Sequence, residues 1–134
     1  MSQNMKVLEA MIDASKRKDH EAFLETMTDD LEYHWHMGTR PIRDKATMRK
    51  FLRNYELGFD QRDWTIVNWA EKDDKILVEG VEKIYDRTRE VLIDNPFMQV
   101  VEFRDGKICK LRDYYDSALV QAPARKETGS ETAA

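Results

Sequence analysis

The chain has 134 residues, and its 22 Lys and Arg against 26 Asp and Glu give a formal net charge of −4. This acidic balance argues against a nucleic-acid partner, and an apolar fraction of 41% is too high for a disordered chain. The single cysteine, Cys109, excludes an internal disulfide, and no run approaches the ~20 apolar residues that span a membrane. We therefore expect a soluble, cytoplasmic protein with one domain over residues 1–120 and a flexible tail over residues 121–134.

The first part of the chain predicts three helices and a strand. Apolar side chains from Val7 to Ile12 recur at helical spacing and predict the first helix. Asp19 and Asp44 stand where N-cap residues are needed for a second and a third helix. Between these two helices, residues 31–37 alternate between two faces, which predicts a strand.

The second part of the chain changes to the period of two that is typical of strands. Four β-rich runs are separated by short turn signals and are expected to be antiparallel neighbours: residues 63–71, 75–85, 89–103 and 107–116. Pro96 interrupts the third run and predicts a bulge or bend. Helices followed by such a meander predict an α+β domain, with the helices packed on one face of a curved sheet. The resulting cone can enclose an apolar cavity for a small molecule.

Alternation along the strands places two carboxyl groups on apolar faces, those of Asp113 and Glu82. The neighbours of Asp113 on its face are Cys109, Leu111 and Tyr115. Burial raises the pKa of a carboxyl, which suits a general acid or base near neutral pH, and two inward carboxyls could share a proton. The alternative is that each acid lies near a strand end, in water or paired with Arg or Lys.

Other side chains are expected to line the same interior. Tyr33 would lie beside the acids, where a phenol can hold a water molecule or an oxyanion; a core tyrosine with a satisfied hydroxyl is the alternative. The side chains expected to contact a substrate are Trp35, Phe51, Val78, Gln99, Val101, Leu111 and Tyr115.

His34 and His36 form an H-x-H pair on the polar face of the predicted strand. Two imidazoles on one face can bind a metal if carboxylates such as Glu32 complete the ligand set. A polar outer face or a subunit contact is the favoured interpretation, so we expect no metal. The sequence contains neither a dinucleotide-binding nor a P-loop glycine motif, and no cofactor is expected.

Two segments and the order of the elements resemble the SnoaL-like, nuclear-transport-factor-2-like (NTF2-like) superfamily. The segments are DDLEYHWHMGTRPIRDKATMRKFL and FRDGKICKLRDYYD. This superfamily includes polyketide cyclases, ketosteroid isomerases and limonene-1,2-epoxide hydrolases. Over about residues 5–120, the resemblance implies a cystatin-like α+β barrel with a mixed or antiparallel sheet. It also implies a homodimer formed through the outer sheet face.

The resemblance can be tested position by position. The catalytic aspartate of ketosteroid isomerases would fall at Trp35, and their oxyanion-hole residues would fall near Gln99 and Met11. All three functional residues are lost, so that mechanism is not expected.

The epoxide hydrolases fit better, since their two acids match Glu82 and Asp113 and their water-holding tyrosine matches Tyr33. Two departures from the epoxide-hydrolase pattern disfavour epoxide opening. Gly80 replaces the arginine that bridges the acids, and Trp35 replaces a water-holding asparagine. Asp113 also matches the proton-transferring acid of SnoaL-like cyclases.

The leading hypothesis is a cofactor-independent, isomerase- or cyclase-like acid–base enzyme. Its substrate would be a small hydrophobic, oxygen-bearing molecule such as a polyketide, steroid or terpenoid. Asp113, Glu82 and Tyr33 would be the catalytic residues. The alternatives are an epoxide hydrolase and a non-catalytic module that binds a ligand or associates with a protein.

Overall fold

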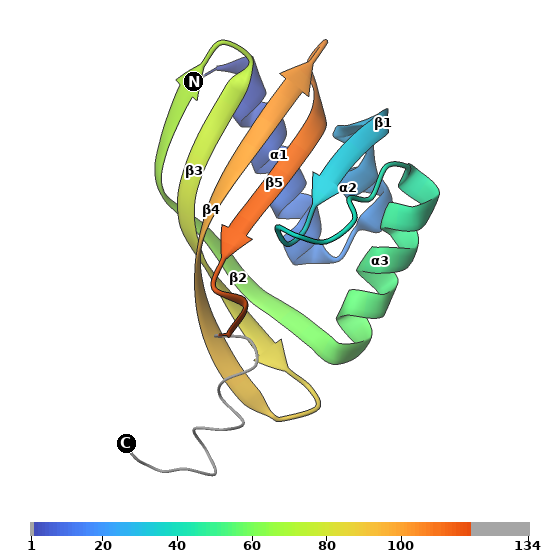
Figure 1. The fold of residues 1–134 in the computed structure, drawn as a ribbon, viewed down its shortest axis with the longest axis vertical. Helices are drawn as coiled ribbons and strands as arrows, with labels where there is room; N and C mark the ends of the chain where they lie inside the picture. The colour runs from blue at the N-terminus through green and yellow to red at the C-terminus, as the bar shows by residue number, and fades with distance from the viewer. Residues whose placement is uncertain (1, 119–134) are drawn as a thin grey trace.

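The structure, a computed structural model, describes residues 2–118 (Figure 1). Within this range the chain forms three helices and five strands: α1 (Gln3–Arg17), α2 (His20–Glu25), β1 (Met27–His34), α3 (Lys45–Gly58), β2 (Phe59–Lys72), β3 (Lys75–Asp86), β4 (Val91–Arg104) and β5 (Lys107–Tyr115). The expected tail over residues 121–134 lies outside the described residues.

Two of the helices begin at the side chains that the sequence predicts as caps. The carboxylate of Asp19 accepts a hydrogen bond from Ala22 N at 3.1 Å and begins α2. The carboxylate of Asp44 accepts one from Thr47 N at 2.7 Å and begins α3. Both predictions are confirmed, and each cap contributes about 1 kcal/mol because it satisfies a backbone N–H that the helix leaves unpaired.

The five strands form one curved sheet in the order β1-β5-β4-β3-β2. β1 runs parallel to β5, and the other three pairs are antiparallel, so the sheet is mixed. Among the described residues β1 and β2 are its edges, and the sheet stays open rather than closing into a barrel. The expected α+β architecture, in which helices pack against a cone-shaped sheet, is confirmed (Figure 1).

The hydrophobic core fills the space between the helices and the concave face of the sheet. Leu8 and Met11 of α1 are fully buried there, as are Val78 of β3 and Val101 of β4. The helices cover only part of the concave face, because α3 lies to one side of the sheet, apart from α1 (Figure 1). This separation leaves room for the cavity described below.

The bulge predicted at Pro96 is absent. Pro96 pairs with Val81 in an unbroken register between β4 and β3. Tyr115 ends β5 and pairs with Phe97, so β4 has no neighbour on that side at Pro96. A proline is tolerated there because a strand edge does not require its missing N–H.

A register shift occurs instead at the start of β5 and corrects the face assigned to Cys109. Ile108 pairs with Phe103 and Lys110 pairs with Glu102, so Cys109 is the extra residue between them. Ile108 is buried in the core, whereas Cys109 is partly exposed and its thiol lies 3.5 Å from Glu102 O. The prediction that Cys109 points inward is therefore wrong, because a bulge reverses the alternation.

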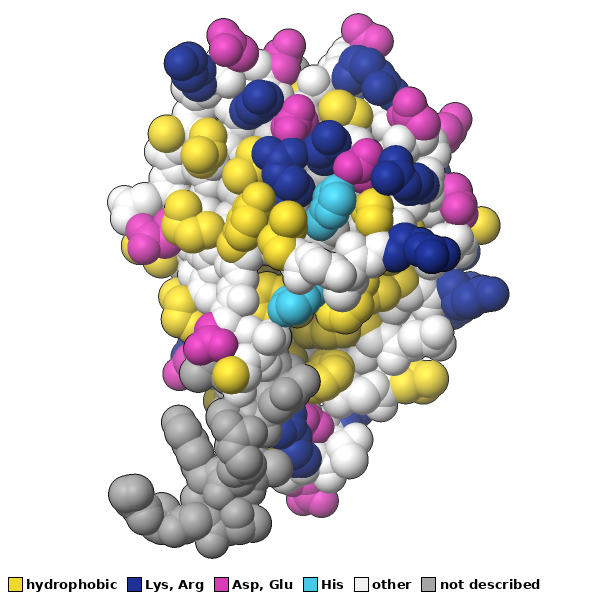
Figure 2. All heavy atoms as spheres, in the orientation of Figure 1, with side chains coloured by type: hydrophobic (Ala, Val, Ile, Leu, Met, Phe, Trp, Pro, Cys, Tyr) yellow, Lys and Arg dark blue, Asp and Glu magenta, His cyan; other side chains and the backbone are white. Residues whose placement is uncertain are grey.

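The outer face of the sheet carries both charged and hydrophobic side chains (Figure 2). Leu77, Met98 and Tyr114 alternate with inward residues and are 40–47% exposed. The homodimer expected through this face stays a prediction. Among the described residues, no helix is long and apolar enough to cross a membrane.

Candidate active site

The concave face of the sheet and the three helices line a cavity of about 440 Å³. Most of its wall is apolar and aromatic, with an edge-to-face contact of Tyr33 on Phe51 and a stack of Tyr55 on Phe59. Partly exposed polar side chains near the C-terminal ends of α1 and α3 form its rim. Two carboxyl groups, those of Asp113 and Glu82, lie inside.

Asp113 accepts two hydrogen bonds from neutral donors. The Tyr33 hydroxyl donates to Asp113 Oδ2 at 2.9 Å, and Gln99 Nε2 donates to Asp113 Oδ1 at 2.5 Å. Gln99 lies directly opposite Asp113 on β4, and Tyr33 reaches it from β1, which pairs in parallel with β5. Three strands thus hold this carboxyl in one orientation.

Burial raises the pKa of Asp113 to about 7. The hydrogen bonds from Gln99 and Tyr33 lower it, and the charge of Glu82 raises it further. Burial also raises the pKa of Tyr33 well above its usual value, and the negative charge of Asp113 acts in the same direction. Tyr33 therefore stays a neutral donor, while Asp113 can gain or lose a proton near neutral pH.

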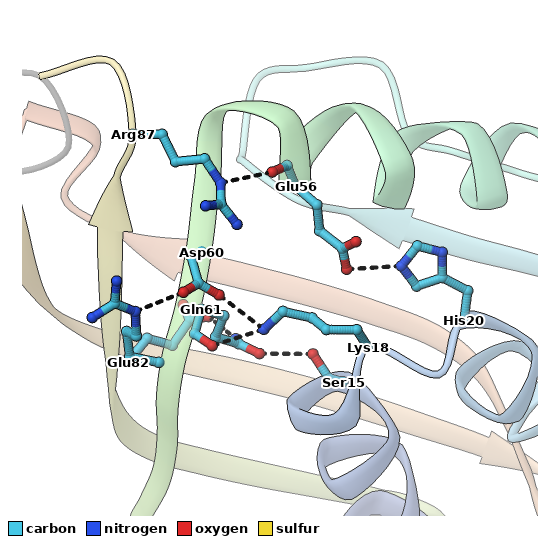
Figure 3. Close-up of polar contacts among 9 residues, drawn as sticks. Ser15, Lys18, His20, Glu56, Asp60, Gln61, Glu82 and Arg87 are labelled. Atoms are coloured by element: carbon cyan, nitrogen blue, oxygen red, sulfur yellow. Dashed lines mark hydrogen bonds and ion pairs between the residues drawn. The ribbon is translucent and has the colours of Figure 1, made fainter. Parts of the chain in front are cut away.

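Glu82 has a separate set of partners, and Figure 3 draws one of them, Gln61. Gln61 Nε2 donates to Glu82 Oε2 at 2.5 Å, and Asn95 Nδ2 lies 3.4 Å from Glu82 Oε1. Burial raises the pKa of Glu82, and these two hydrogen bonds oppose the shift. No hydrogen bond within residues 2–118 joins Glu82 to Asp113, so Glu82 acts on Asp113 through its charge rather than through a shared proton.

Gln61 links the Glu82 side of the cavity to the rim. The Ser15 hydroxyl donates to Gln61 Oε1 at 2.7 Å, and Lys18 Nζ donates to Gln61 O at 2.9 Å (Figure 3). Lys18 also forms an ion pair of 3.2 Å with Asp60. A hydrogen bond of 2.7 Å between His20 and Glu56 joins helices α2 and α3. The contacts of Ser15 and Lys18 fix the end of α1 against the start of β2.

Gly80 lies on the same face between the two acids, where the resemblance implied an arginine. A Cβ atom on Gly80 would lie 2.4 Å from Thr65 O and 2.6 Å from the Phe97 ring. Phe97 pairs with Gly80 across β4 and β3 and covers it. No larger side chain fits at this position, so the two carboxyls are separated by an aromatic ring instead of being bridged by a guanidinium.

The structure places most of the predicted site residues around this cavity. Those that line it are Tyr33, Trp35, Phe51, Glu82, Gln99, Leu111, Asp113 and Tyr115. Val78 and Val101 do not line it. Both are 0% exposed within the core, where the helices cover the sheet, so their prediction as substrate contacts is corrected.

The polar lining residues that were not predicted include Gln61, Trp64 and Asn95 on the sheet. Gln61 precedes the predicted strand, and a register shift between Gln61 and Asp63 hides its alternation. Asn95 alternates with apolar neighbours on the buried face of β4, a signal that could have identified it. The H-x-H pair does not reach the cavity: His34 is 2.7 Å from Glu32. In the described part of the chain, no three His, Cys, Asp or Glu side chains are grouped to hold a metal.

Helices packed against an open, cone-shaped sheet are the NTF2-like α+β fold. Within this fold class, the chain belongs to the SnoaL-like domain family, which matches residues 8–111. No curated protein matches the sequence.

Several solved structures share this fold. An NTF2-like protein of unknown function from Burkholderia pseudomallei is 18% identical with a TM-score of 0.84, covering 91% of this chain and 97% of that chain. An LEH-like epoxide hydrolase from M. tuberculosis is 20% identical with a TM-score of 0.78, covering 94% and 92%. TerC, co-crystallized with polyporic acid, is 21% identical with a TM-score of 0.79, covering 90% and 97%. At these identities the likeness shows the fold alone.

Proposed function

We propose that this protein is a cofactor-independent acid–base enzyme that acts on a small, mostly apolar molecule bearing oxygen, with Asp113 as the general acid and base. One observation carries the proposal. Asp113 lies in an apolar cavity, its pKa is raised to about 7, and two neutral donors hold it in place. A general acid or base works best when its pKa lies near the working pH.

The contacts of Asp113 suit a group that removes a proton and then returns it. When the carboxyl is ionised, the Tyr33 hydroxyl and the Gln99 amide each stabilise one of its oxygens. Each oxygen keeps a second lone pair, which can accept a proton from a substrate carbon or hydroxyl. Because the wall is apolar, the ionised form is poorly solvated and is therefore a stronger base. The same carboxyl can then donate this proton to another atom of the substrate.

The packing at Gly80 disfavours the epoxide-hydrolase alternative. In that chemistry, as the resemblance implies it, an arginine bridges two acids that act together. Here Phe97 and Thr65 occupy the space around Gly80, and each acid has its own amide donor. We therefore favour isomerase- or cyclase-like proton transfer by one carboxyl over attack by a water molecule held between two.

The test uses 5-nitrobenzisoxazole, a small aromatic probe that reports a buried base whatever the natural substrate is. Asp113 would remove the ring C–H proton while the ring N–O bond breaks, and the coloured product is a cyanonitrophenolate. The rate above background should rise with pH through a midpoint of about 7, since only the ionised carboxyl is a base. Asp113→Asn should lower this rate by about 10²- to 10⁴-fold.

Two control variants separate this role from a general effect of charge. Glu82→Gln should lower the rate by less than about tenfold, because Asp113 keeps its donors. Asp13→Asn removes an exposed acid of α1 and should leave the rate unchanged. Equal rates for wild type and Asp113→Asn would contradict the proposal. If apolar ligands then still raised the melting temperature, the protein would be a binding module.

A further inference from the structure

Three residues that line the cavity each have a buried polar atom without a hydrogen-bond partner, although the residues are nine-tenths buried or more. The atoms are Trp64 Nε1, Asn95 Oδ1 and Gln99 Oε1, and their residues are 8%, 2% and 2% exposed. A buried polar atom without a partner is unfavourable and rare in folded proteins. These three atoms therefore mark places where a ligand can complete the hydrogen bonding.

Two of these atoms belong to a single row that crosses three strands. Trp64 of β2 lies opposite Glu82 of β3, and Glu82 lies opposite Asn95 of β4. Side chains at such positions share a face and stand about 5 Å apart at their Cβ atoms. The third atom belongs to Gln99, which lies beside Asp113 in a second row.

The orientation of each amide follows from the carboxyl beside it. Asn95 directs Nδ2 to Glu82, and Gln99 directs Nε2 to Asp113, so both carbonyl oxygens are left as free acceptors. The indole N–H of Trp64 is a donor only. The row around Glu82 thus contains one unpaired donor and one unpaired acceptor, on two residues that both line the cavity. A hydroxyl group matches this pair, since it can accept from the indole and donate to the amide oxygen.

An apolar row separates the two polar rows. It contains Gly80 and Phe97, and the Phe97 ring packs edge-to-face on Trp64 with a centroid distance of 6.2 Å. Asn95 and Gln99 are four residues apart on β4, which is about 13 Å along an extended strand. The curvature of the sheet brings the side chains closer together than that. A ligand touching both rows must therefore be elongated and apolar in its middle.

We infer that Trp64, Glu82 and Asn95 form a second polar subsite that binds a hydroxyl group at the far end of the substrate from Asp113. The inference rests on the proposed function in that both place the substrate in this cavity. It narrows the substrate class to elongated, mainly apolar molecules with an oxygen function at each end. In this arrangement Glu82 binds and orients substrate, and Asp113 alone transfers the proton.

The first test compares three probes of one shape: 4,4′-dihydroxystilbene, 4-hydroxystilbene and trans-stilbene, titrated into the full chain by calorimetry. The second hydroxyl should tighten binding by about two- to tenfold over the single one, which is the value of one net hydrogen bond. If both hydroxylated probes bind equally, the atoms in the row are satisfied by water and the subsite is contradicted.

Two variants locate the effect, each with a matched control. Trp64→Phe keeps an aromatic ring and removes the N–H, so it should abolish the gain from the second hydroxyl. Trp69→Phe alters an exposed tryptophan outside the cavity and should keep that gain. Asn95→Ala should act like Trp64→Phe, whereas Asn68→Ala, at an exposed site of β2, should not. A gain that persists in both cavity variants contradicts the assignment.

The outcomes also separate the subsite from the proposed function. The calorimetry measures binding and not turnover. If the second hydroxyl tightens binding but Asp113→Asn turns over 5-nitrobenzisoxazole as fast as wild type, only the acid–base function is contradicted. Proton transfer from 5-nitrobenzisoxazole that depends on Asp113, without any second-hydroxyl gain, contradicts the subsite alone. Failure of all three stilbenes to bind contradicts the subsite and the apolar substrate class together.

Discussion

The two carboxyl groups in the cavity are built alike but connected differently. Each is buried and each accepts a hydrogen bond from an amide of β4, Gln99 for Asp113 and Asn95 for Glu82. The second donor to Asp113 is Tyr33, a phenol in the aromatic wall. The second donor to Glu82 is Gln61, which is tied to the rim through α1.

This difference indicates that burial alone does not suit an acid to proton transfer. The hydrogen-bond partners around the carboxyl matter as well. The neutral, apolar surroundings of Asp113 leave its pKa near 7. Glu82 instead lies in a network that extends to Ser15 and Lys18 (Figure 3), and it shares a row across the sheet with Trp64 and Asn95, whose polar atoms are unpartnered. That network is suited to fixing a ligand.

The largest stability effect expected from this comparison is at Asp113. Its pKa of about 7 in the folded state exceeds the value near 4 of an unfolded chain, so the folded state binds this proton more tightly. The contribution of this carboxyl to the free energy of unfolding should therefore be fully present below pH 4 and should fall by up to about 4 kcal/mol as the pH rises through 7. Asp113→Asn removes the ionisation and should be more stable than wild type at pH 8.

Urea unfolding of wild type and Asp113→Asn at pH 5 and pH 8 measures this difference. The advantage of the variant should grow with pH, whereas Asp13→Asn, at an exposed position, should show no such growth. A constant difference between Asp113→Asn and wild type at the two pH values would mean that Asp113 titrates normally.

The next effect concerns the apolar row that separates the two acids. Gly80→Ala places a Cβ against the backbone oxygen of Thr65 and the Phe97 ring, and should cost about 1–3 kcal/mol of unfolding free energy. Gly58→Ala is the control, since a Cβ there meets open space at the end of α3. Denaturant unfolding of both variants tests this. If the free energy of unfolding of Gly80→Ala equals that of Gly58→Ala, the strand at Thr65 and the Phe97 ring move aside readily.

A smaller effect is expected at the donor that distinguishes Asp113 from Glu82. Tyr33→Phe removes a hydrogen bond that lowers the pKa of Asp113, so the midpoint of the 5-nitrobenzisoxazole rate should move up by about one to two pH units. Tyr55→Phe changes another cavity tyrosine, which stacks on Phe51 and Phe59, and should leave the midpoint in place. If the midpoint moves equally in both variants, the Tyr33 hydroxyl does not specifically lower the pKa of Asp113.

Local rules account for most of the fold that could be predicted from the sequence. Asp19 and Asp44 were recognisable as caps, because only the residue type and its position before an apolar run are needed. The bulges were not, because they depend on pairing with a neighbouring strand. The register shift beside Cys109 exists only in the pairing of β5 with β4. Pro96, which suggested a bulge, lies where no strand needs its N–H.

The candidate site was predicted only in part, because some of its residues follow from local alternation and others depend on how the strands pair. Alternation placed Asp113 and Glu82 on apolar faces, since it needs no knowledge of the partner strand, but it left open whether they lie in the interior or in water near a strand end. Gln61 and Trp64 were missed because they enter the cavity through the irregular start of β2. Nor could the sequence show that Val78 lies under the helices, away from the cavity.

The most direct test of the account is the titration of the Asp113 carboxyl itself. Carbon-13 NMR of aspartate-labelled protein, with Asp113→Asn used to assign the signal, measures its pKa without any substrate. The account predicts a midpoint of about 7 for this one carboxyl. A midpoint near 4, the ordinary value for aspartate, would contradict the claim that the cavity tunes Asp113 for proton transfer.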